Sequence, residues 1–255
     1  NDGKGRFTDV TGDRMPTVAV KFSWNLEFVD VDNVYDLDVI VSSKKSKGSF
    51  LFENNGKGYF TDITQGHMPQ YTNNYEIEAM DLNADGYLDV ITMNDGEYLD
   101  DGPYARRNHI FLNDGNGGFI NASQKLWMDR DNPAVDDNLA VMLDYDSDGD
   151  PDVLVASLAV TDRLLINDGA GHLRLHTDFM NSFTGDPTHG TLGMGVADLN
   201  GDGKLDVVQS QGKVPGYEDE RVFFGKNIKA DTAPPVIGMV EKIDPTRLPI
   251  IVRAR

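Results

Sequence analysis

Cysteine is absent from the 255 residues of this chain, which excludes disulfide bonds and any catalysis or metal binding through a thiolate. This absence does not fix a cellular compartment. Long hydrophobic runs are missing too: no stretch of about 18 or more apolar residues occurs, so no segment predicts a membrane-spanning helix. The chain also contains neither G-x-S-x-G nor H-E-x-x-H, the short motifs of serine hydrolases and zinc peptidases. We therefore expect a protein that is not an enzyme.

Basic residues are few. The chain has 23 Lys and Arg against 42 Asp and Glu, and its formal net charge is −19 at pH 7. This balance argues against a nucleic-acid partner, because the nucleic-acid backbone is itself anionic. Glycine, with 26 residues, is more frequent than usual, which fits a chain with many tight turns. Much of the excess acid lies in short loops that recur along the chain.

Four acidic loops of one design are present: loop 1 (30–38), loop 2 (81–89), loop 3 (144–152) and loop 4 (198–206). Loops 2 to 4 match D-x-[DN]-x-D-G-x-x-D, with side-chain oxygens at loop positions 1, 3, 5 and 9 and glycine at position 6. Calcium takes about six to eight oxygen ligands, and the position 7 residues would add a backbone carbonyl. The candidate ligands are Asp81, Asn83, Asp85, Tyr87, Asp89, Asp144, Asp146, Asp148, Asp150, Asp152, Asp198, Asn200, Asp202, Lys204 and Asp206, with Asp30, Asp32, Asp36 and Asp38 in loop 1.

These loops are not EF-hands. An EF-hand carries Glu at position 12 and a helix on each side, whereas position 12 is Thr92, Val155 or Gln209 in loops 2 to 4. The β-branched runs that follow each loop predict strands. Each loop is therefore expected to join two strands.

Loop 1 departs from the pattern. It has Val34 where position 5 needs an oxygen and Tyr35 where position 6 needs glycine. We expect loop 1 to bind calcium weakly, to bind it through Asp36, or to stay empty.

A second motif, a glycine-rich turn, recurs out of phase with the loops. It begins at residues 1, 54, 113 and 167, so successive copies lie 53, 59 and 54 residues apart. Asn-Gly and Asp-Gly between apolar runs favour a hairpin turn, and a period of this length indicates a repeat architecture. One repeat then contains strands near 76–80, 88–93 and 108–112 and a fourth that begins at Phe119. Four short antiparallel strands per unit predict an all-β protein built of propeller blades.

The pairing of D-x-[DN]-x-D-G-x-x-D-[LV] with N-D-G-x-G-x-F-T-D-[VI]-T resembles FG-GAP/VCBS-type repeats. The resemblance implies an integrin-α-like β-propeller with calcium in the loop between the first two strands of each blade. It assigns the ligand slots to the loop positions given above. We expect the propeller to span residues 1–226, followed at 227–255 by a linker and the start of an immunoglobulin-like module or a docking tail.

The chain begins in mid-repeat, and its last repeat (193–224) supplies three strands. The first segment is expected to provide the missing fourth strand and close a ring of about four blades. Two alternatives remain open: the chain is a piece of a larger propeller, or a neighbouring copy fills the open slot, which makes rings or filaments.

Three segments fall outside the repeat and are candidates for a binding surface that stacks on sugars or anchors a protein, although ordinary loop packing explains them as well. They are 95–107, 124–137 with Trp127 and Arg130, and 177–190 with Phe179, Phe183 and His189.

The sequence thus favours a calcium-stabilised β-propeller that serves binding, adhesion or structural assembly, with a protein or glycan ligand. Calcium sites that fill at millimolar levels are typical of extracellular modules, so we expect an extracellular or cell-surface location. A carbohydrate-binding or polysaccharide-cleaving propeller and a self-polymerising filament subunit that donates a strand are the alternatives.

Overall fold

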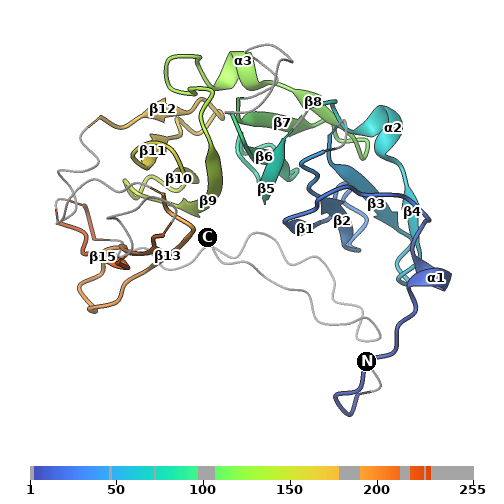
Figure 1. The fold of residues 1–255 in the computed structure, drawn as a ribbon. Coiled ribbons are helices and arrows are strands. Elements are labelled where there is room, and N and C mark those ends of the chain that lie inside the picture. Colours follow the sequence, from blue (N-terminus) through green and yellow to red (C-terminus); the bar gives the residue numbers. More distant parts are fainter. Residues whose placement is uncertain are drawn as a thin grey trace.

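The computed structural model describes residues 3–45, 48–71, 73–96, 107–177, 190–212, 219–226 and 228–230. In these ranges fifteen strands form four antiparallel sheets, and three single-turn helices lie between them. The sheets follow one another around an open arc, with the first strand of each sheet on the inside (Figure 1). This is the arrangement of propeller blades, and we number the sheets blade 1 to blade 4 in chain order.

Within each blade, neighbouring strands are neighbours in the sequence. Blade 1 contains β1 (Leu26–Val29), β2 (Asp38–Val41), β3 (Phe50–Asn54) and β4 (Phe60–Asp62). Blade 2 contains β5 (Asn74–Met80), β6 (Asp89–Asn94), β7 (His109–Asn113) and β8 (Phe119–Asn121). Blade 3 contains β9 (Asp137–Leu143), β10 (Asp152–Ser157), β11 (Arg163–Ile166) and β12 (Arg174–Leu175), and blade 4 contains β13 (Gly193–Ala197), β14 (Asp206–Ser210) and β15 (Arg221–Phe223). The strands predicted for blade 2 are confirmed to within two residues at their ends.

The second strands of blades 2 and 3 are the most deeply buried parts of the chain. All six residues of β6 and all six of β10 are buried. A strand in the middle of a blade has another blade on each face, so both of its faces need apolar side chains. This explains why the sequence after loops 2 and 3 is a largely continuous apolar run and not an alternating one.

A single helical turn follows the last strand of blades 1 and 2, at α2 (Thr64–His67) and α3 (Ser123–Leu126). A third, α1 (Thr11–Arg14), precedes blade 1 at the same point of the repeat. Each turn begins at a residue whose backbone N–H donates to an Asp or Asn side chain two positions earlier, as in Thr64 to Asp62 at 3.0 Å. The Asp-x-Thr part of the glycine-turn motif therefore starts a helical turn directly after the last strand of the hairpin.

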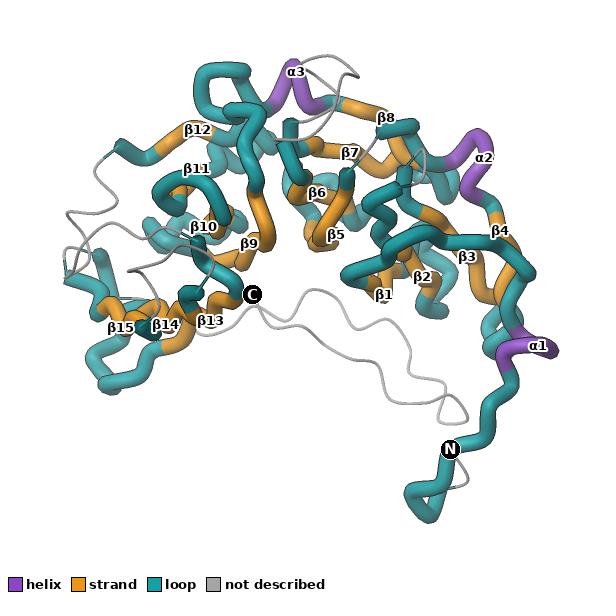
Figure 2. Tube along the Cα trace, in the orientation of Figure 1, coloured by secondary structure: helices purple, strands orange, loops and turns teal. Residues whose placement is uncertain are grey.

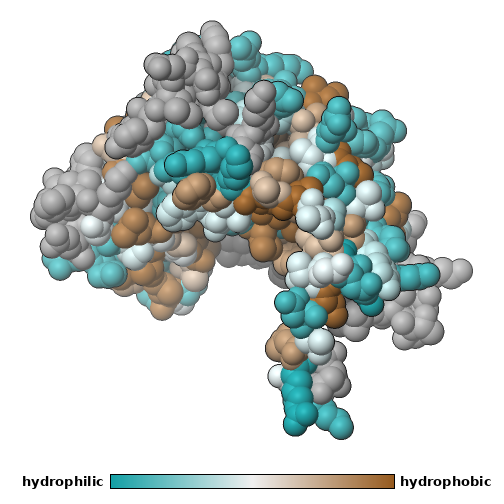
Figure 3. All heavy atoms as spheres, turned by 45° about the vertical axis from the view of Figure 1, so that its right-hand side comes forward, coloured by the Kyte–Doolittle hydropathy of each residue, from teal (hydrophilic) through white to brown (hydrophobic). Residues whose placement is uncertain are grey.

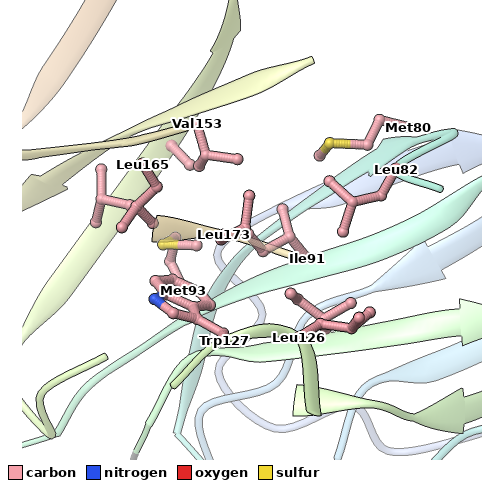
Figure 4. Close-up of a cluster of buried hydrophobic side chains, with 12 residues drawn as sticks. Met80, Leu82, Ile91, Met93, Leu126, Trp127, Val153, Leu165 and Leu173 are labelled. Carbon is pink, nitrogen blue, oxygen red and sulfur yellow. The ribbon is translucent and has the colours of Figure 1, made fainter. Parts of the chain in front are cut away.

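Three hydrophobic cores fill the spaces between successive blades, and Figure 4 shows the middle one. The core of blades 1 and 2 contains Val29, Val31, Ile40, Leu51, Met68, Tyr71, Ile77, Val90, Phe111 and Phe119. The core of blades 2 and 3 contains Met80, Leu82, Ile91, Met93, Ile110, Leu126, Trp127, Ala140, Val153, Val155, Leu165 and Leu173. The core of blades 3 and 4 contains Leu143, Tyr145, Leu154, Leu164, Val207, Phe223 and Ile228.

The expectation that the first segment completes blade 4 is wrong for this structure. Blade 4 has three strands among the described residues, and residues 3–10 form no strand. Figure 2 places the N-terminal segment beside β4, at the other end of the arc from β15. Arg14 holds it there, because its guanidinium donates to the carbonyl of Lys57 at 2.9 Å and lies 3.8 Å from the ring centre of Tyr59. The blades therefore form an open arc and not a closed ring.

Several sequence-based expectations lie outside the described residues. These are most of the insertion at 95–107, most of the connection at 177–190, and all of the tail at 227–255 except 228–230. Among the helices that are described, none has the length and apolar character that a membrane span requires.

One half-buried acid links two blades. The carboxylate of Glu76, on β5, accepts a hydrogen bond of 2.5 Å from the backbone N–H of Ala140, on β9. Burial raises the pKa of Glu76 from 4.5 to about 8, and the nearby Glu78 and Glu27 add to the effect. In the folded protein this acid therefore holds its proton over a pH range in which the unfolded chain has lost it.

We expect Glu76→Gln to become more stabilising as the pH rises. In the wild-type protein, the stabilisation that follows from the raised pKa of Glu76 is fully present below the unfolded pKa of 4.5. It is lost as the pH rises toward the folded value of about 8. Glutamine keeps the acceptor oxygen and cannot ionise, so its gain over wild type should reach on the order of 2 kcal/mol above pH 8. Urea denaturation of both proteins at a series of pH values measures the difference, and a difference that does not change with pH would contradict the assignment.

Candidate functional site

The four acidic loops occupy one structural position. Each joins the first and second strands of its blade: β1 to β2, β5 to β6, β9 to β10 and β13 to β14. The expectation that these loops connect strands and not helices is confirmed. Because the blades repeat, all four loops lie at the same end of the strands.

The carboxylate at position 1 shapes each loop. In loop 3, Asp144 accepts hydrogen bonds of 3.1 Å from the backbone N–H groups of both Asp148 and Gly149, at positions 5 and 6. The same pair of bonds recurs at Asp81 in loop 2 and at Asp198 in loop 4. The turn folds around this carboxylate, whose negative charge then lies inside the loop.

The carboxylate at position 9 connects the loop to the third strand of its blade. Asp152 is fully buried, and it accepts bonds of 2.8 Å from the N–H of Tyr145, in the loop, and from the N–H of Asn167, just after β11. The equivalent acids, which make the same two kinds of bond, are Asp38, Asp89 and Asp206. Position 9 is therefore a structural residue whether or not a metal is bound.

Carboxylates from different positions converge in two of the loops. One oxygen from each of Asp144, Asp146 and Asp152 lies within 4.8 Å of the others, and the same holds for Asp30, Asp32 and Asp38. In loops 2 and 4 position 3 is an amide, Asn83 or Asn200, so only positions 1 and 9 of these three carry a carboxylate there. The structure thus brings positions 1, 3 and 9 together in loops 1 and 3.

Position 5 connects to position 7 by a hydrogen bond in loops 2 to 4. Its carboxylate accepts from the next-but-one N–H, as in Asp85 with Tyr87 at 2.9 Å and Asp148 with Asp150 at 3.2 Å. In loop 4 the Lys204 ammonium also lies 3.7 Å from Asp202.

The convergence of acids carries an electrostatic cost. Burial raises the pKa of Asp38 and Asp89 to about 6 and that of Asp152 to about 7, and neighbouring loop carboxylates add to each shift. Asp150, at position 7 of loop 3, also has its pKa raised to about 6 by burial and by the other acids of the loop. A divalent cation held by oxygen ligands would offset this repulsion. The donor set of carboxylate and amide oxygens therefore fits calcium.

Loop 1 keeps the backbone of the others without their glycine. The N–H groups of Val34 and Tyr35 both donate to Asp30, as positions 5 and 6 do elsewhere. Tyr35 has a φ of 69°, in the left-handed region where Gly86 and Gly149 have 90° and 98°. A residue with a Cβ is strained there by about 1 kcal/mol. Loop 1 is thus folded like the complete loops and differs from them in the missing position 5 oxygen.

Two asparagines of the glycine-rich turns, expected from the sequence only to shape those turns, also connect neighbouring blades. The side-chain N–H of Asn113 donates to the carbonyl of Val31, in loop 1, and that of Asn167 donates to the carbonyl of Leu82, in loop 2, both at 2.9 Å. Each of these turns therefore holds position 2 of the acidic loop in the preceding blade. The recurrence of asparagine at the first residue of the turn is the sequence signal for this contact.

The sugar-stacking role considered for Trp127 is wrong. Trp127 is 1% exposed in the core between blades 2 and 3, and its indole N–H donates to the carbonyl of Asp131 at 3.0 Å. Arg130 is exposed and pairs with Asp131 at 3.5 Å. The other aromatic candidates, Phe179 and Phe183, lie outside the described residues.

Comparison with known proteins identifies the repeat. A family model described as FG-GAP-like repeat matches residues 35–92 and 144–208. Each match begins in one acidic loop and ends in the second strand of the next blade, so each spans one repeat. A comparison with curated proteins gives no match.

Among solved structures, one match is a lectin from Agrocybe aegerita, described as specifically recognising non-reducing terminal N-acetylglucosamine. It is 20% identical with a TM-score of 0.40, and the match covers 72% of this chain and 45% of that one. The present chain thus spans less than half the length of that protein, and a likeness at this level says nothing about its ligand. Residues 35–92 and 144–208 therefore carry FG-GAP-like repeats, and the described part of the chain folds as antiparallel blades in a propeller-like arc.

Proposed function

We propose that this chain is a calcium-stabilised binding module that serves adhesion or structural assembly outside the cell or at its surface. The observation that carries the proposal is the convergence of Asp144, Asp146 and Asp152, and of Asp30, Asp32 and Asp38, each with oxygens within 4.8 Å of one another. Acids gathered in this way destabilise a folded chain unless a cation offsets their charge. The FG-GAP-like repeat over two regions agrees with this interpretation.

The residues that would hold calcium are those at positions 1, 3, 5 and 9, with the position 7 residues adding a carbonyl. When bound, the ion supplies positive charge and a fixed set of oxygen contacts. The chain's own groups do the rest: position 1 organises the turn and position 9 connects it to the third strand. The asparagine side chains of the glycine-rich turns then connect each ordered loop to the next blade by a hydrogen bond. A rigid row of loops, one per blade and all at the same end of the strands, is the expected result.

Nothing in the described residues favours a catalytic role, and we propose a non-enzymatic module. A glycan ligand remains an outcome to test and not a second proposal, because Trp127 is a core residue. A glycan array probed with the wild-type protein in millimolar calcium addresses it directly. Binding to a defined sugar would replace the assembly role by a lectin role.

We expect calcium to raise the melting temperature of the wild-type protein relative to chelator. Ligand at about 100 times its Kd contributes about 2.7 kcal/mol per site, and each 1 kcal/mol shifts the melting temperature of a domain of this size by about 2–4 °C. Differential scanning calorimetry in millimolar calcium and in chelator measures the effect. An unchanged melting temperature would contradict the proposal.

Asp144→Asn and Asp30→Asn form a matched pair for this test. Both residues stand at position 1 and accept the same two backbone bonds, so their structural costs should be equal in chelator. In calcium, Asp144→Asn should cost more, because loop 3 has a position 5 carboxylate and loop 1 has Val34 there. Equal costs in calcium would contradict the ranking of the sites.

A further inference from the structure

The three interblade cores follow one rule. Each blade has two faces, which we call face A and face B, and in every described core face B of one blade packs on face A of the next. Face B contributes Val29, Ile40 and Leu51 from blade 1, Met80, Ile91 and Ile110 from blade 2, and Leu143, Leu154 and Leu164 from blade 3. Face A contributes Ile77, Val90 and Phe111 from blade 2, Ala140, Val153 and Leu165 from blade 3, and Val207 and Phe223 from blade 4.

Strand register confirms that these positions are equivalent. On face A, Val90 is paired with Phe111 and Val207 with Phe223. On face B, Leu154 is paired with Leu164, and the matching pair in blade 4 is Val208 with Val222. The rule therefore identifies the residues that belong to face A of blade 1 and to face B of blade 4, the two faces at the ends of the arc.

Both end faces carry exposed apolar side chains, although the centre of face A of blade 1 is covered: Val39 and Phe52, which the rule matches to Val90 and Phe111, are 7% and 2% exposed. On face A of blade 1, Leu26 and Phe28 are 51% and 52% exposed, and on face B of blade 4, Val208 and Val222 are 37% and 50% exposed. The face B residues that match Val208 and Val222 in blades 1 to 3 are at most 1% exposed. Hydrophobic surface is visible at both limbs of the arc in Figure 3. Large apolar patches on a soluble protein mark interaction sites.

The charges beside the two faces are opposite. Lys21 and Lys45 are exposed where β1 begins and β2 ends, and the Lys45 ammonium lies 4.5 Å from the ring centre of Phe22. Asp219 and Glu220 are exposed just before β15, at the matching end of blade 4. Face B of blade 4 therefore complements face A of blade 1 in packing rule and in charge, whereas two copies of one face would bring like charges together.

We propose that face B of blade 4 binds face A of blade 1 of a second copy of this chain, which continues the blade-to-blade packing between molecules. The contact joins two different surfaces, so it is heterologous and gives a ring if the rotation closes and a filament if it does not. It is a contact between faces and needs no exchanged strand. The inference does not depend on calcium and goes beyond the proposed metal sites.

Light scattering on a sizing column tests the proposal with the whole chain at about 100 μM, above the micromolar Kd values of weak interfaces. We expect a mass at least twice the 28.1 kDa of one chain. Phe28→Lys removes face A and Val222→Lys removes face B, and each alone should give 28.1 kDa. In an equimolar mixture of the two variants, the intact face B of the Phe28→Lys protein can bind the intact face A of the Val222→Lys protein. The mixture should therefore give a mass of two chains and no more.

The matched control is a lysine substitution at an exposed apolar residue outside both end faces. Ile120, on β8, is such a residue, so Ile120→Lys should keep the wild-type mass. Circular dichroism confirms that each variant is folded. A wild-type mass of one chain, assembly that survives both end-face variants, or assembly lost only on deletion of residues 1–10 would overturn the proposal, the last in favour of strand donation.

Discussion

Asp152→Ala is expected to lower the free energy of unfolding by about 2–4 kcal/mol even in chelator. The carboxylate is fully buried and accepts two backbone hydrogen bonds of 2.8 Å, one from Tyr145 and one from Asn167. Alanine leaves both buried N–H groups without an acceptor, and each costs about 1–3 kcal/mol. Relief of a desolvated charge offsets part of this loss, because burial raises the pKa of Asp152 to about 7.

Urea denaturation measures the loss, and Asp146→Ala is its control. Asp146 belongs to the same loop and to the same carboxylate cluster but is exposed. In chelator its replacement should cost little, whereas in calcium both variants should lose the stabilisation that the ion provides. A loss below about 1 kcal/mol for Asp152→Ala in chelator would show that position 9 has no structural role of its own.

Trp127→Ala is expected to cost about 3–5 kcal/mol and to leave the protein partly unfolded at ordinary temperatures. The indole is 1% exposed in the core between blades 2 and 3, where Figure 4 shows it beside Met93. Its loss opens a cavity between two blades and leaves the carbonyl of Asp131 without its donor.

Trp127→Phe separates packing from the hydrogen bond. Phenylalanine keeps most of the buried surface, so the cost should fall to about 1–2 kcal/mol. Thermal melts followed by circular dichroism measure both variants. A Trp127→Ala protein with wild-type stability would contradict the core assignment and would restore the idea of an exposed sugar platform.

The acidic loops and the blade pattern could be predicted because their information is local. Glycine at position 6 predicts a positive φ, and oxygen side chains at fixed spacing predict a turn that encloses charge. The apolar run after each loop reports a strand buried on both faces, and β6 and β10 are buried throughout. The strand boundaries of blade 2 followed from these signals.

Features set by contacts between distant residues could not be predicted in this way. Trp127 lies in an irregular connection, and only the packing of two blades decides that its ring is buried. The position of the N-terminal segment depends on Arg14 and Tyr59, which are far apart in the chain. The glycine-turn motif at residues 1–11 predicts a fourth strand, but it does not specify which blade the strand would join.

Loop 1 shows that a turn can form without the residue its motif prefers. Tyr35 stands in place of glycine and still adopts a φ of 69°, because the hydrogen bonds that Asp30 accepts and the two flanking strands fix the turn. The surrounding structure thus overrides the local preference at this position. The missing position 5 oxygen is the feature of loop 1 that bears on the proposed calcium site.

Isothermal calorimetry of calcium binding to chelator-treated protein is the decisive experiment for the proposed metal loops. Saturable binding is expected at three sites per chain, in loops 2, 3 and 4, with loop 1 weaker or empty, and Asp144→Asn should lose one site. Saturation should lie at or below the millimolar calcium of extracellular fluids. No saturable binding in that range, or binding that Asp144→Asn leaves unchanged, would contradict the assignment of these loops as metal sites.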